Sequence, residues 1–123
     1  MSQISSLLPK IGIKTVSVVT DDTTLDVNKG YIANKAGLVT FTLPATASIG
    51  DVIEITGINT GFGWKIAQNA NQAINIVNVQ STVGVLGSVS SSEIYDSIRL
   101  MCTVGGTSTR WNALSLTGNL TIL

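Results

Sequence analysis

Short runs of alternating apolar and polar residues, separated by glycine-bearing turns, constrain the fold of this chain more than any other feature. From Thr15 onward the period is two, which is the period of a half-buried β-strand. The clearest run has Val39, Phe41 and Leu43 on one face and threonines on the other. Pro44 ends this run, because proline cannot donate a hydrogen bond to a β-ladder.

Eight or nine such runs follow one another at roughly ten-residue spacing, and no segment keeps a helical period. They are residues 15–19, 30–34, 38–43, 51–57, 64–67, 73–79, 94–104, 111–116 and 118–123. The pattern predicts an all-β fold, either an antiparallel β-sandwich or a jelly-roll-like barrel of about eight short strands. Residues 105–109, with two glycines, are expected to form a hairpin turn.

The first 14 residues lack this alternation and contain Pro9 and Gly12. We therefore divide the chain into an N-terminal arm, residues 1–14, and a single β-sandwich module, residues 15–123. The arm has no positive charge ahead of an apolar core, so it is not expected to be a secretory signal. No run of 18 apolar residues occurs, and no membrane insertion is expected.

Charge is scarce and balanced. Seven basic and seven acidic residues give a net charge of zero, and charged residues are 11% of the chain against about 25% in ordinary domains. Nucleic-acid binding needs a clustered basic face, so the balance argues against that partner. Low charge and a hydroxyl- and amide-rich surface favour self-association, which predicts a subunit of a tight oligomer. The alternative is a monomer with an uncharged polar surface.

The side chains of acid–base and nucleophilic catalysis are largely missing. The chain has no histidine, so neither Cys102 nor the serines at residues 90–92 have the usual activating partner. Cys102 lies in an apolar run and is expected to be a buried small hydrophobe. Asp51 and Glu54 fall on opposite faces of a predicted strand and cannot form a carboxylate pair.

The remaining acidic residues are expected to be structural. The aspartates of residues 21–26 are interpreted as turn and cap residues, with calcium binding as the alternative. Asp96 has the parity of apolar neighbours. A buried carboxylate needs a charged partner, which could be Arg99 or Arg110, or several hydrogen-bond donors. The sequence therefore predicts no catalytic residue, no metal site and no cofactor.

Two polar loops flank the short strand that carries Trp64. We expect Trp64 to lie in the core with Phe41, Ile53 and Ile66, although an exposed tryptophan could stack on a sugar ring. The loop amides could bind sugar hydroxyls or stack as ladders between subunits. The candidate surface-recognition residues are Asn59, Thr60, Phe62, Gln68, Asn69, Asn71, Gln72 and Ser90.

Several short segments, taken in order, resemble a β-rich module of tail-fibre and tailspike-like virion proteins of tailed bacteriophages. The segments are residues 30–34, 39–46, 50–54, 63–70 and 118–121. The resemblance covers residues 28–123. It implies a trimeric, non-enzymatic β-unit on a phage particle, exposed to the host surface, with no catalytic residues to transfer.

The function expected first is host-surface attachment by a homotrimer at the phage tail, with other virion proteins and a host surface glycan as partners. Three weak sites held together would bind by avidity. The alternative is a capsid decoration protein that stabilises the shell through residues 1–14. A glycan depolymerase is disfavoured, because it needs two carboxylates about 5–10 Å apart and the acidic residues lie mostly in predicted turns.

Overall fold

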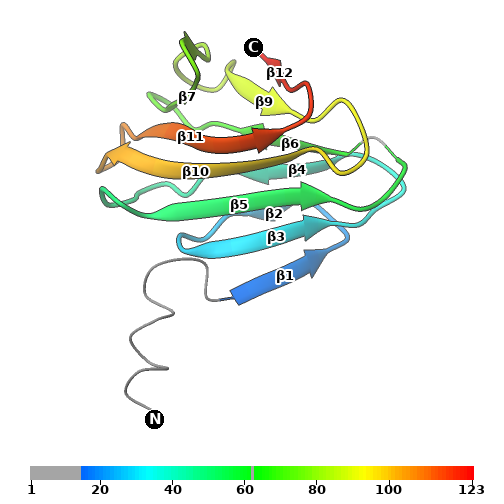
Figure 1. Cartoon of the computed structure of the whole chain (residues 1–123). Helices are drawn as coiled ribbons and strands as arrows, with labels where there is room; N and C mark the ends of the chain where they lie inside the picture. Colours follow the sequence, from blue (N-terminus) through cyan, green and yellow to red (C-terminus); the bar gives the residue numbers. More distant parts are fainter. Residues whose placement is uncertain (1–14, 62) are drawn as a thin grey trace.

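The computed structural model describes residues 15–61 and 63–123, which form twelve strands in two sheets that pack face to face (Figure 1). No helix occurs among these residues. The prediction of an all-β sandwich is therefore confirmed. The predicted arm, residues 1–14, and the candidate residue Phe62 lie outside the described residues.

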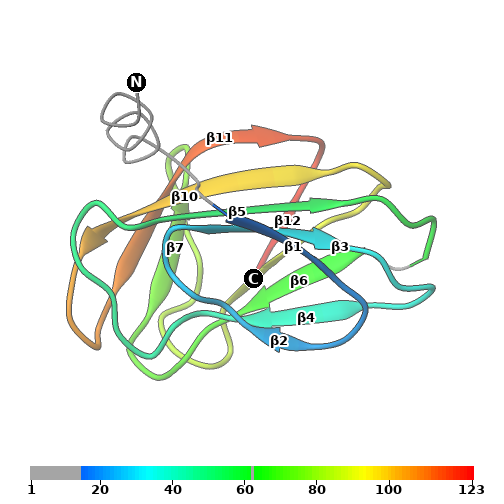
Figure 2. The same cartoon turned by 90° about the horizontal axis from the view of Figure 1, so that it is seen from below.

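The larger sheet has seven strands, and the chain order across it is not sequential. Its strands are β1 (Thr15–Val19), β3 (Lys29–Ala33), β5 (Val52–Gly57), β10 (Ser97–Val104), β11 (Arg110–Thr117), β7 (Ala73–Ile76) and β8 (Val79–Gln80). The five strands of the smaller sheet are β12 (Thr121–Ile122), β9 (Ser88–Ser90), β6 (Trp64–Ala67), β4 (Val39–Thr42) and β2 (Thr23–Thr24). Figure 2 shows the smaller sheet beside the larger one from below.

The expectation of antiparallel pairing is wrong for half of the strand pairs. From β1 to β7 the chain changes sheet at every strand, so β1, β3 and β5 are parallel neighbours in one sheet. In the same way β2, β4 and β6 are parallel neighbours in the other. A strand that returns after crossing to the opposite sheet runs in its original direction. Antiparallel pairs come later, at β5–β10, β10–β11 and β6–β9.

The expected strand count was too low because some predicted runs are interrupted. The run over residues 73–79 is divided at Val77, whose φ of 55° reverses the chain between β7 and β8. β2 has only two residues, too few to show an alternation. The predicted strands at residues 15–19 and 64–67 are confirmed as β1 and β6, and the predicted hairpin at residues 105–109 joins β10 to β11.

The core lies between the sheets and contains the residues that the alternation assigned to it. Trp64, Phe41, Ile53 and Ile66 are fully buried, as predicted, and so is Cys102. Burial of one such large side chain stabilises the fold by about 1.5–3 kcal/mol. The outer face of each sheet is consequently left for polar side chains and for contacts with other molecules.

Candidate functional site

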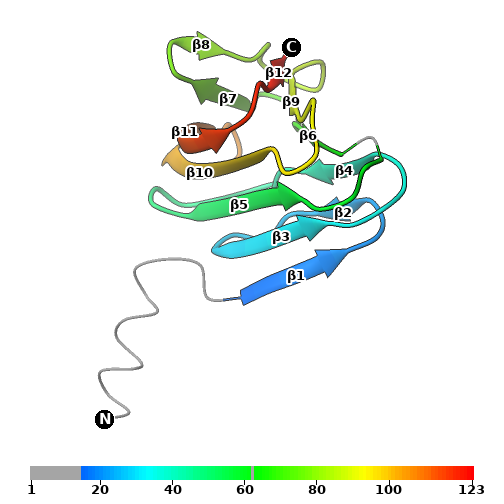
Figure 3. The same cartoon turned by 45° about the vertical axis from the view of Figure 1, so that its right-hand side comes forward.

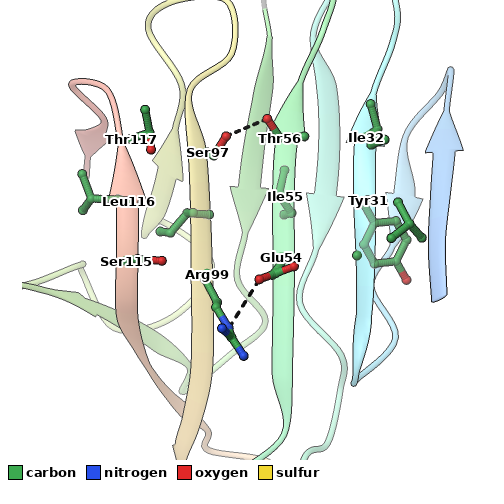
Figure 4. Close-up of a pocket in the computed structure, with 13 residues that line it drawn as sticks. Tyr31, Ile32, Glu54, Ile55, Thr56, Ser97, Arg99, Ser115, Leu116 and Thr117 are labelled. Carbon is green, nitrogen blue, oxygen red and sulfur yellow. Dashed lines mark hydrogen bonds and ion pairs between the residues drawn. The ribbon is translucent and has the colours of Figure 1, made fainter. Parts of the chain in front are cut away.

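A groove of about 360 Å³ crosses the outer face of the larger sheet, and we call it the sheet groove. Five strands line it: β1, β3, β5, β10 and β11 (Figure 4). The strand register places residues of three strands side by side in the groove, since Arg99 is opposite both Glu54 on β5 and Ser115 on β11. Val16 and Ile32 add apolar surface at the β1 and β3 side.

The polar contacts of the sheet groove are cross-strand pairs. Arg99 Nε lies 3.4 Å from Glu54 Oε1, and the two side chains are 36% and 42% exposed. A pair this exposed contributes about 1 kcal/mol or less. The Arg99 Nε atom is itself buried and makes no hydrogen bond, so Glu54 alone compensates it. Arg99 is the one cation among the described residues that line the groove, and Glu54 neutralises it. Because the walls are also partly apolar, the groove is better suited to a polypeptide segment than to a small anion.

A second cavity, of about 400 Å³, lies between the β5–β6 and β9–β10 loops, and we call it the loop cavity. Its described lining is mostly glycine, hydroxyl and acidic: Thr60, Gly61, Gly63, Ser91, Ser92, Glu93 and Ile94. The candidate residue Thr60 therefore lies at a hollow of the surface. Ser90, another candidate, is half-buried and pairs with Lys65 and Thr121 inside the smaller sheet.

The amide-rich run after β6 is less exposed than the sequence predicted. Gln68 is 4% exposed and Gln72 is completely buried, so the prediction that these two side chains form a contact surface is wrong. Asn69 is half-buried, and its Nδ2 donates to the Leu43 carbonyl at 2.9 Å. Of the four amides in the run only Asn71 is exposed.

Gln68 is the centre of a buried hydrogen-bond network. Its Nε2 donates to the carbonyl oxygens of Gln72 at 2.7 Å, Thr82 at 3.0 Å and Gly84 at 3.0 Å. Its Oε1 accepts a hydrogen bond from the Ser81 hydroxyl. These contacts fasten the loop after β8 to the loop before β7.

Gln72 extends the same network toward the end of β4. Its Nε2 donates to the Pro44 carbonyl at 2.8 Å, and its Oε1 accepts from the Asn69 amide at 2.8 Å. The buried amides therefore satisfy backbone groups that no strand partner reaches, which is the usual condition for polar groups in a core. We call Gln68, Gln72 and Ser81 the buried amide network.

The structure does not bring the two predicted recognition loops together. Asn59 and Thr60 precede β6, whereas residues 68–72 follow it, so the loops lie at opposite ends of that strand. Four residues of strand separate them by about 13 Å. The Asn59 side chain donates to Asn34 Oδ1 at 3.2 Å and accepts from the Gly61 amide, which shapes its own loop.

The larger sheet carries an exposed amide row that the sequence did not predict. Asn75 Nδ2 donates to Asn112 Oδ1 at 2.8 Å, and Gln80 Nε2 donates to Asn75 Oδ1 at 2.8 Å. The Thr103 hydroxyl also contacts Asn112 Oδ1, at 3.3 Å. This exposed amide row crosses β10, β11, β7 and β8. No periodicity in one strand could have revealed it, because it depends on which strands are neighbours.

Two long segments of the chain contain no charged side chain. Residues 66–92 and 111–123 contain no Asp, Glu, Lys or Arg, and they supply β7, β8, β9 and β12, which lie together at the top of Figure 3. We call these residues the uncharged end. Several of their apolar side chains face solvent: Val77 is 93% exposed, Leu86 80% and Val85 69%.

Asp96 is compensated by several hydrogen-bond donors, and not by Arg99 or Arg110. Its Oδ2 accepts from the backbone amides of Ser92 at 2.8 Å and Glu93 at 2.9 Å. Arg99 pairs with Glu54, and Arg110 donates to the Asn71 carbonyl at 2.7 Å. Of the two alternatives that the sequence left open, backbone amides within a tight loop compensate the buried carboxylate.

Burial controls the titration of two core groups. It raises the pKa of the Cys102 thiol, and the nearby Asp51 charge adds to the increase. It also raises the pKa of Tyr31, whose hydroxyl oxygen accepts from the Asp26 amide at 2.7 Å. At the surface, the Asp22 amide and then Lys35 lower the pKa of Asp21. A buried thiol with a raised pKa is a poor nucleophile.

Within residues 15–61 and 63–123, no group of three or more Cys, Asp or Glu side chains is placed to hold a metal ion. The same residues include no helix with the length and apolar character needed to cross a bilayer. The resemblance to phage tail modules rests on the sequence segments given above. No family model matches the chain, and the comparison with curated proteins finds no match.

Proposed function

We propose that this chain is a non-enzymatic structural protein of a phage particle, a homotrimeric tail-fibre or tailspike-like module that attaches to the host surface. The observation that supports assembly most directly is the uncharged end, where Val77, Val85 and Leu86 face solvent. Large apolar side chains this exposed favour a contact with another protein, because their exposure to water is unfavourable.

The loop that carries Val85 and Leu86 is held in place. Gln68 binds the carbonyls of Thr82 and Gly84, and the Gly84 amide donates to the Gln72 carbonyl at 2.9 Å. A loop that is already ordered loses less conformational entropy when it enters an interface. The buried amide network thus supports assembly indirectly, by fixing the loop of residues 82–87.

Attachment is assigned to the opposite end of β6, at the loop cavity. Thr60 offers an exposed hydroxyl group there, which suits the hydroxyls of a host surface glycan. The Ser91 and Ser92 hydroxyls donate to the Trp64 and Asn119 carbonyls, and their oxygens keep lone pairs that can accept hydrogen bonds from a ligand. One such shallow site would bind weakly. Three copies in a rigid trimer raise the apparent affinity far above that of a single site.

Sedimentation analysis of the purified chain tests the trimer. We expect a species of three times the 12.8 kDa chain mass. Leu86→Asp should convert it to monomer, since the side chain is exposed and the fold does not need it. Ile49→Asp is the matched control, because Ile49 is 75% exposed but lies outside the uncharged end. A wild-type chain that stays monomeric at micromolar concentration contradicts the proposal.

Imaging of labelled chain on intact particles tests the position. Attachment predicts label at the tail and inhibition of particle adsorption by the free chain, with both retained when residues 1–14 are deleted. Label spread over the capsid shell, together with a shell that becomes less stable after that deletion, would instead identify a decoration protein. Thr60→Arg should reduce adsorption without changing the oligomer mass.

A further inference from the structure

The sheet groove begins at an edge strand, whose outer side pairs with no other strand of residues 15–61 and 63–123. β1 is the outermost strand of the larger sheet, and its Val16 and Val18 are 59% and 58% exposed. Register places them beside Gly30 and Ile32 on the outer face. Gly30 has no side chain to fill the space next to Val16. The sheet groove therefore begins at β1, the first strand that the structure describes.

We infer that the sheet groove is the binding site of residues 1–14 of the same chain. The first reason is connection, since these residues join β1 at Thr15, one position before the groove residue Val16. A tethered segment has an effective local concentration in the millimolar range, which a separate chain rarely matches. This inference does not depend on the proposed function.

The second reason is length. The groove runs from β1 to β11 across four inter-strand spacings, which is about 19 Å. Residues 4–11 span about 26 Å when extended, enough to cross it. Gly12 precedes β1 by three positions and tolerates the backbone conformations that a reversal of direction requires.

The third reason is complementary chemistry. The arm offers five branched apolar side chains, Ile4, Leu7, Leu8, Ile11 and Ile13. The groove offers exposed Val16 and half-buried Ile32 for them to cover. Lys10 and Lys14 are the only charged side chains of the arm, and Glu54 is half-exposed in the groove as a partner for one of them.

Disulfide trapping in the full-length chain tests the inference. Ser6→Cys and Ser115→Cys are combined, because Ser115 lies in the groove on β11 and Ser6 is within about 30 Å of chain length from Thr15. We expect mild oxidation to join the two within one chain in most molecules. The control pair is Ser6→Cys with Thr24→Cys, which is exposed on β2 of the other sheet. The buried Cys102 stays in place.

A mixture of isotopically labelled and unlabelled chains distinguishes a disulfide within one chain from a disulfide between two chains. Disulfides that join labelled to unlabelled chains would show that a second copy fills the groove and would overturn the inference. A yield no higher than that of the control pair would also overturn it. Val16→Lys, at an exposed site, should reduce trapping at least fivefold while the circular dichroism spectrum is unchanged. Unchanged trapping in that variant would again count against the inference.

Discussion

Two amide networks in this molecule use the same chemistry for different ends. The buried amide network centres on Gln68, whose amide group bridges three carbonyls that no strand reaches. The exposed amide row links Asn112, Asn75 and Gln80 across neighbouring strands. Both have hydrogen bonds of about the same length. They differ in whether water can replace a lost partner.

That difference sets the energetic weight of each network. When an exposed amide is removed, water bonds to the groups left behind and little stability is lost. When a buried amide is removed, the carbonyls keep their desolvation cost without compensation, at about 1–3 kcal/mol for each group. Amide content by itself therefore says nothing about whether a segment is a contact surface or a scaffold.

Gln68→Met should have the largest effect, because the substitution keeps the volume but removes every hydrogen bond of the Gln68 side chain. We expect the free energy of unfolding to fall by about 3 kcal/mol. The Thr82 carbonyl loses its donor, the Ser81 hydroxyl loses its acceptor, and the Gln72 and Gly84 carbonyls each keep only a backbone amide donor. Urea unfolding at one fixed protein concentration measures it. A loss below about 1 kcal/mol would show that water reaches these carbonyls and that the network is not closed.

Gly87→Ala tests the packing around the same amide. A Cβ atom at residue 87 would meet the Thr82 carbonyl and lie 2.5 Å from Gln68 Nε2, so the network must shift. We expect a loss of about 2 kcal/mol in the unfolding free energy, typical of overpacking. Gly37→Ala is the matched control, since the nearest contact there is 3.8 Å away on a flexible lysine. Equal losses in the two variants would contradict the proposed contact.

Tyr31 extends the comparison to titration of a buried polar group. Its pKa is raised by burial, so the folded state holds the phenol proton more tightly than the unfolded state. The resulting stability is complete below the unfolded pKa of about 10 and is lost as pH rises through the folded value. Thermal unfolding should show a Tm that is level up to about pH 10 and falls at higher pH. Tyr31→Phe should flatten that slope, and an unchanged slope would assign the loss to another group.

Gln80→Met should have the smallest effect. The side chain is exposed at the edge of the larger sheet and donates only to Asn75 Oδ1. We expect a change below about 0.5 kcal/mol in the unfolding free energy. Water can donate a hydrogen bond to Asn75 Oδ1 in place of the lost Gln80 amide. A loss comparable to that of Gln68→Met would remove the distinction between the two networks.

Much of the fold could be predicted from local pattern. Val39, Phe41 and Leu43 alternate with threonines, and all three are buried. Trp64 was assigned to the core for its place beside Ile66 at a strand start, and both are fully buried. Such predictions succeed because burial of one face of a strand forces a period of two on its own residues.

The candidate site could be predicted only in part. Thr60 and Asn71 are exposed as expected, but Gln68 and Gln72 are not. A glutamine in a loop is predicted to lie at the surface unless the carbonyls that its amide binds are known. Those carbonyls belong to Pro44, Thr82 and Gly84, far from the amide run in sequence.

The sequence by itself determined the all-β class, the apolar faces of the strands and the burial of Trp64 and Cys102 in the core. These follow from local periodicity and side-chain hydrophobicity. Only the tertiary structure decided the parallel pairing of β1, β3 and β5, the burial of Gln68 and the position of Glu54 directly opposite Arg99 on the neighbouring strand. Each depends on which distant segments become neighbours, and the pattern within one strand carries no record of its neighbours.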